Sequence, residues 1–294
     1  MAEPRETWAI GRLLAATAAF LADKGSASPR LDAELMLSKV LALPKVQLYV
    51  NFERELSAQE LDDYRELVRR RSKHEPVAYI LGHKEFHGLK FKTSPAALIP
   101  RPETEHLVDE ALRLARDLWP GEEIRIADIG CGSGAIALSL AANLKEAHLS
   151  AVDISPRALN LARENAEALG LAERVEFFEG DLLSPLGQRD YHLICANLPY
   201  IPSPEMKTLM PDVGLHEPHL ALDGGPEGLA PILRLLESSP AHLRADGRIL
   251  LEIWPPSCPA LKKAAAALGF DAAEPLRDLA GLARVAVLKR SAAR

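Results

Sequence analysis

The sequence predicts an α/β protein in which a small helical domain precedes a mostly parallel sheet. Helical patterns without a strand signal fill residues 1–74, and a proline-rich stretch with one glycine-centred alternation covers residues 75–103. From residue 104 to residue 294, short apolar runs alternate with longer amphipathic stretches, which is the pattern of βαβ units. We therefore expect a helical domain, a linker with a β-hairpin and a sheet domain, in that order.

Local signals mark the helices of the first part. Gly25 follows an amphipathic stretch and suits a C-cap, while Ser28 and Pro29 suit an N-cap and a first helical position. Ser57 and Glu60 have the spacing of a capping box. The helices expected here span residues 7–24, 30–41 and 57–71.

The linker is expected to hold one short hairpin. Residues 86–92 alternate around Gly88, and Pro95, Pro100 and Pro102 then break any helix. In the last part, helices are expected at residues 104–118, 134–144, 156–169, 227–238 and 258–268, and strands at 124–129, 148–152, 174–178, 191–196, 248–253 and 284–289. Ligands of such sheets bind at the carboxyl ends of the strands, so functional residues are expected directly after strands.

Composition narrows the class of protein. The 294 residues carry a formal net charge of −6, and an acidic chain is not expected to bind nucleic acid stably. The three cysteines, Cys131, Cys195 and Cys258, form no CxxC pair, which excludes a disulfide scaffold and argues against a structural zinc site. Neither a charge-free apolar run long enough for a membrane span nor a signal-peptide pattern at the start is seen, so we expect a cytoplasmic protein.

A glycine-rich turn predicts a nucleoside-type cofactor. The segment from Asp128 to Gly134 follows an apolar strand and opens a helix, and its glycines let the backbone approach a ligand closely. Asp153 ends the next strand, where an acid accepts hydrogen bonds from ribose hydroxyls, and Asp181 ends the strand after it, where it suits an adenine amino group. Three acids at successive strand ends favour S-adenosylmethionine, whose sulfonium is positively charged. The residues expected to bind it are Asp128, Gly130, Cys131, Gly132, Ser133, Gly134, Asp153, Asp181 and Leu182.

A second motif, Asn197-Leu198-Pro199-Tyr200, follows the strand expected at residues 191–196. A turn leaving a strand explains the proline alone. Methyl transfer to a planar nitrogen explains the whole motif, because such a nitrogen is a poor nucleophile and needs acceptors aimed at its N–H bonds. The Asn197 side-chain oxygen and the backbone carbonyl of Pro199 or Leu198 suit that role, and Tyr200 suits stacking on the planar group. The Asn197 side chain is also expected to touch the cofactor.

Together these segments resemble the release-factor glutamine N5-methyltransferases, the HemK-type enzymes. The resemblance covers nearly the whole chain, and its most discriminating segment is Ile-Pro-Arg-Pro-Glu-Thr-Glu at residues 99–105. It rests further on residues 76–82, 85–89, 128–134, 197–200, 217–225 and 278–281.

The resemblance implies a Rossmann-like class I methyltransferase sheet and a substrate, the glutamine of the Gly-Gly-Gln loop in class 1 peptide chain release factors. It also places Thr104 near the cofactor, although a plain helix N-cap explains Thr104 equally well. We interpret residues 1–74 as the part that recognises the protein substrate, with a scaffold as the alternative. One departure is Leu198, where the usual family pattern has proline. Enzymes that methylate adenine N6 in ribosomal RNA commonly carry Asn-Leu-Pro-Tyr.

Three alternatives stay open at this point. An adenine N6-methyltransferase acting on RNA or DNA is expected to carry a basic groove, which the acidic balance disfavours. A nicotinamide-dependent dehydrogenase fits Gly130, Gly132 and Ala135, but no histidine falls in a persuasive hydride-transfer motif. A non-catalytic module is disfavoured by the intact Asn197, Pro199 and Tyr200.

Overall fold

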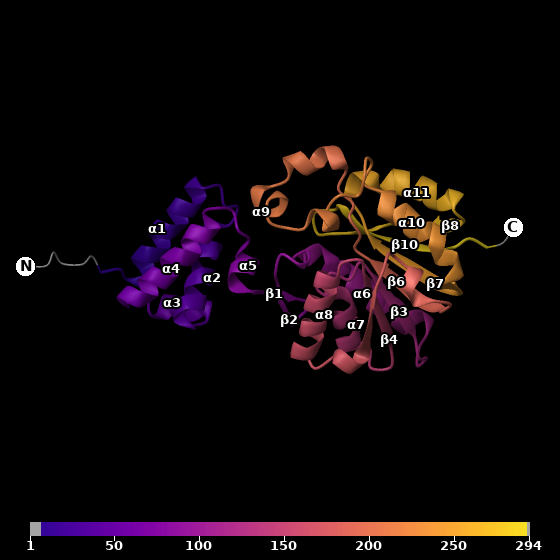
Figure 1. Cartoon of the computed structure of the whole chain (residues 1–294), viewed down its shortest axis with the longest axis horizontal. Coiled ribbons are helices and arrows are strands. Elements are labelled where there is room, and N and C mark those ends of the chain that lie inside the picture. The colour runs from indigo at the N-terminus through magenta and orange to yellow at the C-terminus, as the bar shows by residue number, and fades with distance from the viewer. Residues whose placement is uncertain (1–6, 293–294) are drawn as a thin grey trace, which may run out of the picture. The chain divides into compact units, whose positions relative to one another are not determined.

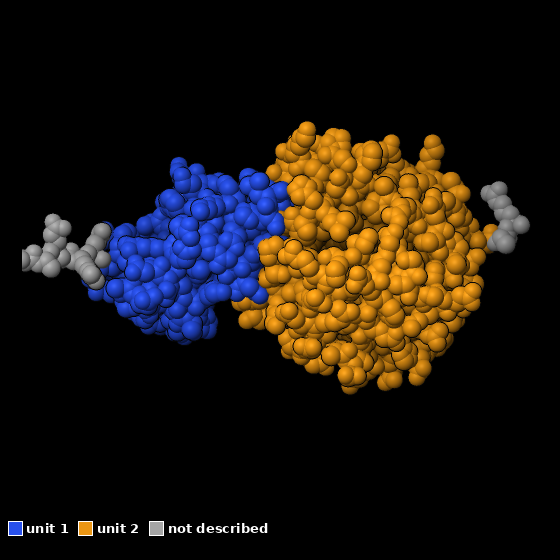
Figure 2. Space-filling model, viewed as in Figure 1, with its two compact units in different colours: residues 1–82, 210–216 blue, residues 83–209, 217–294 orange. Residues whose placement is uncertain are grey.

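The computed structural model describes residues 7–292, so the opening residues 1–5, whose polar character entered the cytoplasmic expectation, lie outside it. The chain divides into two compact units, residues 1–82 with 210–216 and residues 83–209 with 217–294 (Figure 2). The predicted combination of a helical N-terminal domain with an α/β sheet is confirmed (Figure 1). No helix of the described part is long and apolar enough to cross a membrane.

The first unit is helical and buries its own apolar core. Ser57 and Glu60 form the expected capping box, and Gly25 follows the first helix with a φ of 81°. Ser28 stands at the N-cap before Pro29, but its side chain makes no capping hydrogen bond. The helices are α1 (Ile10–Asp23), α2 (Pro29–Leu41), α3 (Lys45–Val50), α4 (Ala58–Arg71), α5 (Val77–Leu81) and α9 (Pro211–Gly214). The sequence patterns missed α3, α5 and α9, which are too short to show a helical period.

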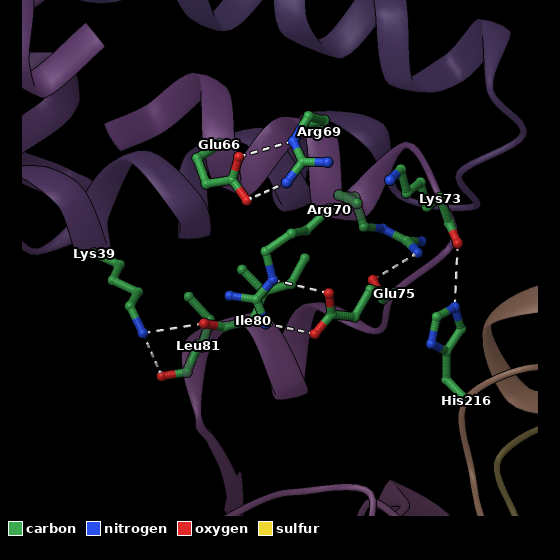
Figure 3. A network of polar contacts seen from close by, with 10 residues as sticks. Lys39, Glu66, Arg69, Arg70, Lys73, Glu75, Ile80, Leu81 and His216 are labelled. Carbon is green, nitrogen blue, oxygen red and sulfur yellow. Dashed lines mark hydrogen bonds and ion pairs between the residues drawn. The ribbon is translucent and has the colours of Figure 1, made fainter. Parts of the chain in front are cut away.

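Polar contacts join parts of this helical unit that are far apart in the sequence (Figure 3). The Lys39 ammonium donates to the carbonyls of Ile80 and Leu81 at 3.0 and 2.9 Å, at the end of α5, where carbonyls lack helical partners. The returning segment 210–216 is joined to α4 and the turn after it. His216 Nε2 lies 3.1 Å from the Lys73 carbonyl (Figure 3), and the Asp212 carboxylate lies 3.7 Å from the Arg71 guanidinium.

The second unit begins with the predicted hairpin. Strand β1 (His83–Phe86) pairs antiparallel with β2 (Leu89–Lys92). The two turn residues, His87 and Gly88, have φ values of 48° and 74°, as a tight turn matched to the strand twist requires. The backbone N–H of His87 donates to the Glu105 carboxylate at 2.7 Å, which ties the hairpin to the start of the next helix.

The main sheet has the order β5-β4-β3-β6-β7-β10-β8, with β9 paired to β10. The first five strands of that order are parallel and β10 is antiparallel. The strands are β3 (Arg125–Ile129), β4 (His148–Asp153), β5 (Val175–Glu179), β6 (Tyr191–Ala196), β7 (Leu243–Glu252), β8 (Phe270–Ala272), β9 (Leu276–Arg277) and β10 (Ala283–Arg290). The six expected strands are therefore present, and β7 begins earlier than predicted because its first half, including Asp246, is polar and partly exposed. Strands β8 and β9 were missed because they are very short.

The two faces of this sheet bury separate apolar layers. Helices α6 (Glu105–Leu118), α7 (Ala135–Asn143) and α8 (Pro156–Ala168) pack into one layer. Helices α10 (Ala230–Ser238) and α11 (Cys258–Ala267) pack into the other. Short 3-10 turns occur at Pro102–Thr104, Ala172–Arg174, Ser184–Leu186, Ser203–Thr208, His219–Ala221, Ser239–Ala241 and Pro255–Ser257. With both faces covered, the carboxyl edge of the parallel strands is left for a ligand.

Candidate functional site

One cavity of about 260 Å³ lies at that carboxyl edge. The cavity is lined by the segments that follow β3, β4, β5 and β6 and by residues that follow the hairpin. Expected site residues that line it are Thr104, Gly130, Cys131, Gly132, Ser133, Asp153, Asp181, Leu182, Asn197, Leu198 and Pro199. Asp128, Gly134 and Tyr200 are outside its lining.

The glycine-rich turn after β3 forms the floor of the cavity. The φ angles of Gly130 and Gly132 are 73° and 56°, a region that residues with a Cβ rarely adopt. The Gly132 N–H donates to Asp153 Oδ2 at 2.8 Å. Asp153 Oδ1 accepts from the Ser155 N–H at 2.9 Å, and burial raises the pKa of Asp153. Two backbone donors therefore hold this carboxylate at the rim of the turn.

Asp128, which we expected to bind the cofactor, does not line the cavity. Its side chain is fully buried, and Oδ2 accepts from the Ala137 N–H at 3.0 Å in the first turn of α7. Oδ1 has no hydrogen-bond partner among the described residues, and burial raises the pKa of Asp128 to about 7. Gly134 is the N-cap of α7 with a φ of 81°. Asp128 and Gly134 therefore support the glycine-rich turn without lining the cavity.

Asp181 is engaged by a residue that the sequence patterns did not indicate. Its carboxylate pairs with the guanidinium of Arg234 on α10, and both side chains line the cavity. The next residue, Leu182, has a φ of 50°, which costs a non-glycine residue roughly 1–2 kcal/mol. No spacing rule finds Arg234, because α10 reaches Asp181 only through the fold.

The Asn197-Leu198-Pro199-Tyr200 turn is joined to two further residues by hydrogen bonds. Asn197 Nδ2 donates to Thr104 Oγ1 at 3.2 Å, and Thr104 Oγ1 donates to Glu252 Oε2 at 2.5 Å. The Tyr200 hydroxyl donates to Glu252 Oε1 at 3.0 Å. Thr104 occupies the N-cap position of α6, as expected, but its side chain makes no capping hydrogen bond and contacts Asn197 and Glu252 instead. Sequence patterns missed Glu252, which reads as the polar end of an apolar strand.

Burial dominates the electrostatics of this network. Glu252 is 2% exposed, and desolvation raises its pKa, although both hydroxyl donors lower it. Desolvation and the neighbouring Glu252 carboxylate also raise the pKa of Tyr200, so its hydroxyl stays protonated and donates. The Tyr200 ring packs against an apolar core layer, and its expected stacking on a substrate stays a prediction.

Known protein families match residues in both units of the chain. The PrmC N-terminal domain family matches residues 12–82, and the Methyltransferase small domain family matches residues 105–210. A release factor glutamine methyltransferase of Geobacter sulfurreducens is 44% identical over 86% of this chain and 87% of that protein. The same name belongs to a Rhodopirellula baltica protein that is 37% identical over 97% of both chains.

The chain belongs to the release factor glutamine methyltransferase family. A third member, from Moorella thermoacetica, is 43% identical over 89% of this chain and 91% of its own length. Solved structures share the fold. A methyltransferase from Pyrococcus furiosus superposes with a TM-score of 0.51 over 70% of this chain and 90% of that chain, at 17% identity. The hMettl16 catalytic domain gives 0.54 over 74% and 83%, also at 17% identity.

Two segments that are far apart in the sequence meet beside the cavity. Glu217 is buried, its Oε2 accepts from the Ile99 N–H at 3.1 Å, and its Oε1 pairs with the Arg101 guanidinium. Ile99 and Arg101 line the cavity. Glu217 therefore holds the Ile-Pro-Arg-Pro-Glu-Thr-Glu segment beside the cavity.

Leu198, the departure from the family pattern, is a packing residue here. It is 6% exposed, and its Cδ2 lies 3.0 Å from where a Cβ on Gly130 would be. Its side chain therefore fills the space beside the glycine turn. Since the full-length relatives carry the glutamine methyltransferase name, the adenine and dehydrogenase alternatives are not supported for this family member.

Proposed function

We propose that this protein transfers the methyl group of S-adenosylmethionine to the side-chain amide nitrogen of the glutamine in the Gly-Gly-Gln loop of a class 1 release factor. The observation that carries the proposal is the Asn197 side chain, which lines the cavity next to the glycine turn. Membership of the release factor glutamine methyltransferase family supports the substrate. The expected cytoplasmic location follows from that substrate.

The residues of the cavity fit the proposed cofactor. Gly130 and Gly132 line the cavity without side chains and have positive φ angles, and the Asp153 carboxylate at the rim suits ribose hydroxyls. The Asp181 carboxylate suits the adenine amino group, and the Leu182 backbone follows it directly. Arg234 pairs with Asp181 in this structure. The bound cofactor supplies an electrophilic methyl group on a positively charged sulfur.

The chain's own contribution to the reaction is positioning. Asn197 Oδ1 accepts one N–H of the substrate amide, and a backbone carbonyl accepts the other. Pro199 O lies 2.7 Å from where a Cβ on Gly224 would be, so that carbonyl faces the Gly224 backbone. Neither carbonyl accepts a backbone N–H within residues 7–292, and because the Pro199 carbonyl faces Gly224 we assign the Leu198 carbonyl as the second acceptor. Holding the nitrogen in line with the methyl group removes most of the entropic barrier.

The test measures methyl transfer directly. Purified release factor and ribosomal RNA are each incubated with the enzyme and labelled S-adenosylmethionine, and the products are analysed by mass spectrometry. We expect a methyl group on the Gly-Gly-Gln glutamine and none on RNA. Asn197→Ala should lower kcat by about 10²–10³, the loss seen for one preorganised polar group, with a smaller effect on cofactor affinity. Methylated adenine beside an unmodified release factor overturns the proposal.

A further inference from the structure

Glu252 is a buried carboxylate without an ion-pair partner. It ends β7, next to the end of β6 that carries Asn197, and it is 2% exposed. Within residues 7–292 no Lys or Arg lies within ion-pair distance of it, and Arg284 is instead paired with Asp278 at 2.7 Å. Burying a carboxylate without a cation costs stability, so the hydrogen bonds from its two hydroxyl partners are the contacts that offset this cost.

Those contacts have a direction that chemistry dictates. The Thr104 hydroxyl donates its single proton to Glu252 Oε2, which is the direction that the ionised carboxylate requires because it only accepts hydrogen bonds. The Thr104 oxygen then has only lone pairs to offer Asn197. The Asn197 amide nitrogen must face Thr104, as it does at 3.2 Å, and Oδ1 is turned away from it. Within the described residues the Asn197 side chain makes no other hydrogen bond, and it lines the cavity.

We propose that Glu252 is a positioning residue that sets, through Thr104, which end of the Asn197 amide faces the substrate. The proposal rests on the proposed role of Asn197 as the acceptor for the reacting amide. The two ends of an asparagine amide have nearly the same shape, so packing alone does not choose between them. A flipped amide aims N–H donors at the N–H donors of the substrate. Glu252 also holds the Tyr200 hydroxyl, so one carboxylate organises two residues of the Asn-Leu-Pro-Tyr turn.

Glu252→Gln tests the direction of these hydrogen bonds while keeping the shape of the side chain. A glutamine accepts through one atom and donates through the other, so it matches only one of the two hydroxyls. When its nitrogen faces Thr104, the Thr104 proton turns to Asn197 and the amide flips. We expect kcat to fall about 10- to 100-fold, less than complete loss of the preorganised group, while KM and the Kd of S-adenosylmethionine stay within about twofold.

Reversing the direction of the hydrogen bonds that join Asn197, Thr104 and Glu252 gives the sharper test. In Asn197→Asp alone, two carboxylates compete for the one Thr104 proton, and activity should fall below about 1%. In Glu252→Gln/Asn197→Asp, the glutamine donates to Thr104, Thr104 donates to the aspartate, and a carboxylate oxygen again faces the substrate. The same Glu252→Gln change that impairs the wild type should therefore raise the activity of Asn197→Asp at least about tenfold. The double variant keeps the wild-type net charge.

Variants at Thr104 separate a hydrogen-bond chain from a restored charge. Thr104→Ser keeps the hydroxyl and should retain most activity, whereas Thr104→Val should lower kcat and abolish the rescue in the double variant. Rescue that persists with valine overturns the proposal, as does a loss of activity from Glu252→Gln that is equal in both backgrounds. Thermal unfolding confirms that each variant is folded. If Asn197→Ala itself leaves kcat unchanged, the proposed function of Asn197 fails, whatever Glu252 does.

Discussion

Acidic residues at three successive strand ends have three different surroundings. Asp128 is fully buried and supports the first turn of α7, whereas Asp153 lines the cavity and is held by two backbone donors. Asp181 is partly exposed and paired with Arg234. Their shared position after a strand therefore does not give them a shared role. Of the three, Asp153 is the acid most suited to a ribose.

Asp153→Ala should weaken S-adenosylmethionine binding. The substitution removes the ribose acceptor and also the partner of the Gly132 N–H. Hydrogen bonds to a charged group contribute about 1.5–3 kcal/mol each, so the Kd should rise about 10- to 150-fold. Isothermal titration calorimetry measures this, with circular dichroism as the check of folding. An unchanged Kd in a folded variant rules out the assignment.

Asp128 should make stability depend on pH between about 4 and 7. Its pKa is raised from 3.8 to about 7 by burial, so the folded protein keeps a proton that the unfolded chain releases. Stability is then full below the unfolded pKa and falls as pH rises toward 7, by at most about 1.4 kcal/mol per pH unit. Asp128→Asn lacks this titration. Urea unfolding at pH 4.5, 6 and 8 should show the wild type losing stability relative to the variant; parallel curves contradict the pKa.

At the scale of elements, the loop that contains Gly224 and Gly228 packs on the Asn197–Tyr200 turn. A Cβ on Gly224 would lie 2.7 Å from Pro199 O, and one on Gly228 would lie 2.3 Å from Tyr200 O. The loop is also bound through the Gly224 N–H, which donates to the Ile201 carbonyl at 2.8 Å. The segment between β6 and α10 therefore shapes the backbone from which Asn197 projects.

Gly228→Ala should impair catalysis by displacing the Tyr200 backbone. Gly170→Ala is the matched control, because Gly170 also has a positive φ, 69° against 72° for Gly228, but nothing lies within 4 Å of its added Cβ. Both changes carry the strain of an alanine in that conformation, roughly 1–2 kcal/mol. We expect at least about tenfold lower kcat for Gly228→Ala alone, since a displacement near 1 Å costs up to about 10². Equal kcat values in steady-state assays of the two variants contradict this.

At the scale of the whole molecule, the helical unit is the part proposed to recognise the release factor. This unit also includes the segment 210–216, which lies between residues 83–209 and 217–294 of the second unit in the sequence. Remote contacts are needed because a Gly-Gly-Gln loop is too short to supply much binding energy. The large apolar residues exposed on this unit are Phe20, Leu31, Val46, Tyr49, Val50, Phe52, Met210 and Leu215.

Removal of the helical unit should separate cofactor binding from substrate recognition. The variant lacks residues 1–82 and carries a glycine-serine linker of equal length in place of 210–216, the full extent of the unit. Every cavity-lining residue is retained, so the Kd for S-adenosylmethionine should stay within about threefold of the wild type. kcat/KM for intact release factor should fall by at least about 10², because binding energy from remote contacts is lost. Full-rate methylation by the folded variant refutes the recognition role.

Signals carried by neighbours in the chain could be predicted from the sequence. The capping box at Ser57, the hairpin turn at Gly88, the glycine turn after β3 and the Asn197–Tyr200 motif each depend on residues a few positions apart. Backbone conformation and strand–helix alternation are local physics, so these elements follow from spacing alone, as does the position of the glycine turn and the Asn197–Tyr200 motif at the carboxyl edge.

Which residues complete the site was decided only by the tertiary structure. Thr104 and Glu252 are 148 positions apart, Arg101 and Glu217 are 116 apart, and Asp181 and Arg234 are 53 apart. No local pattern encodes these contacts, because they arise when β7 pairs with β6 and when the start of α6 comes to the same edge of the sheet. The sequence by itself placed the glycine turn and the Asn197–Tyr200 motif directly after strands, because those signals are local. Strand order together with burial decided which distant residues contact them.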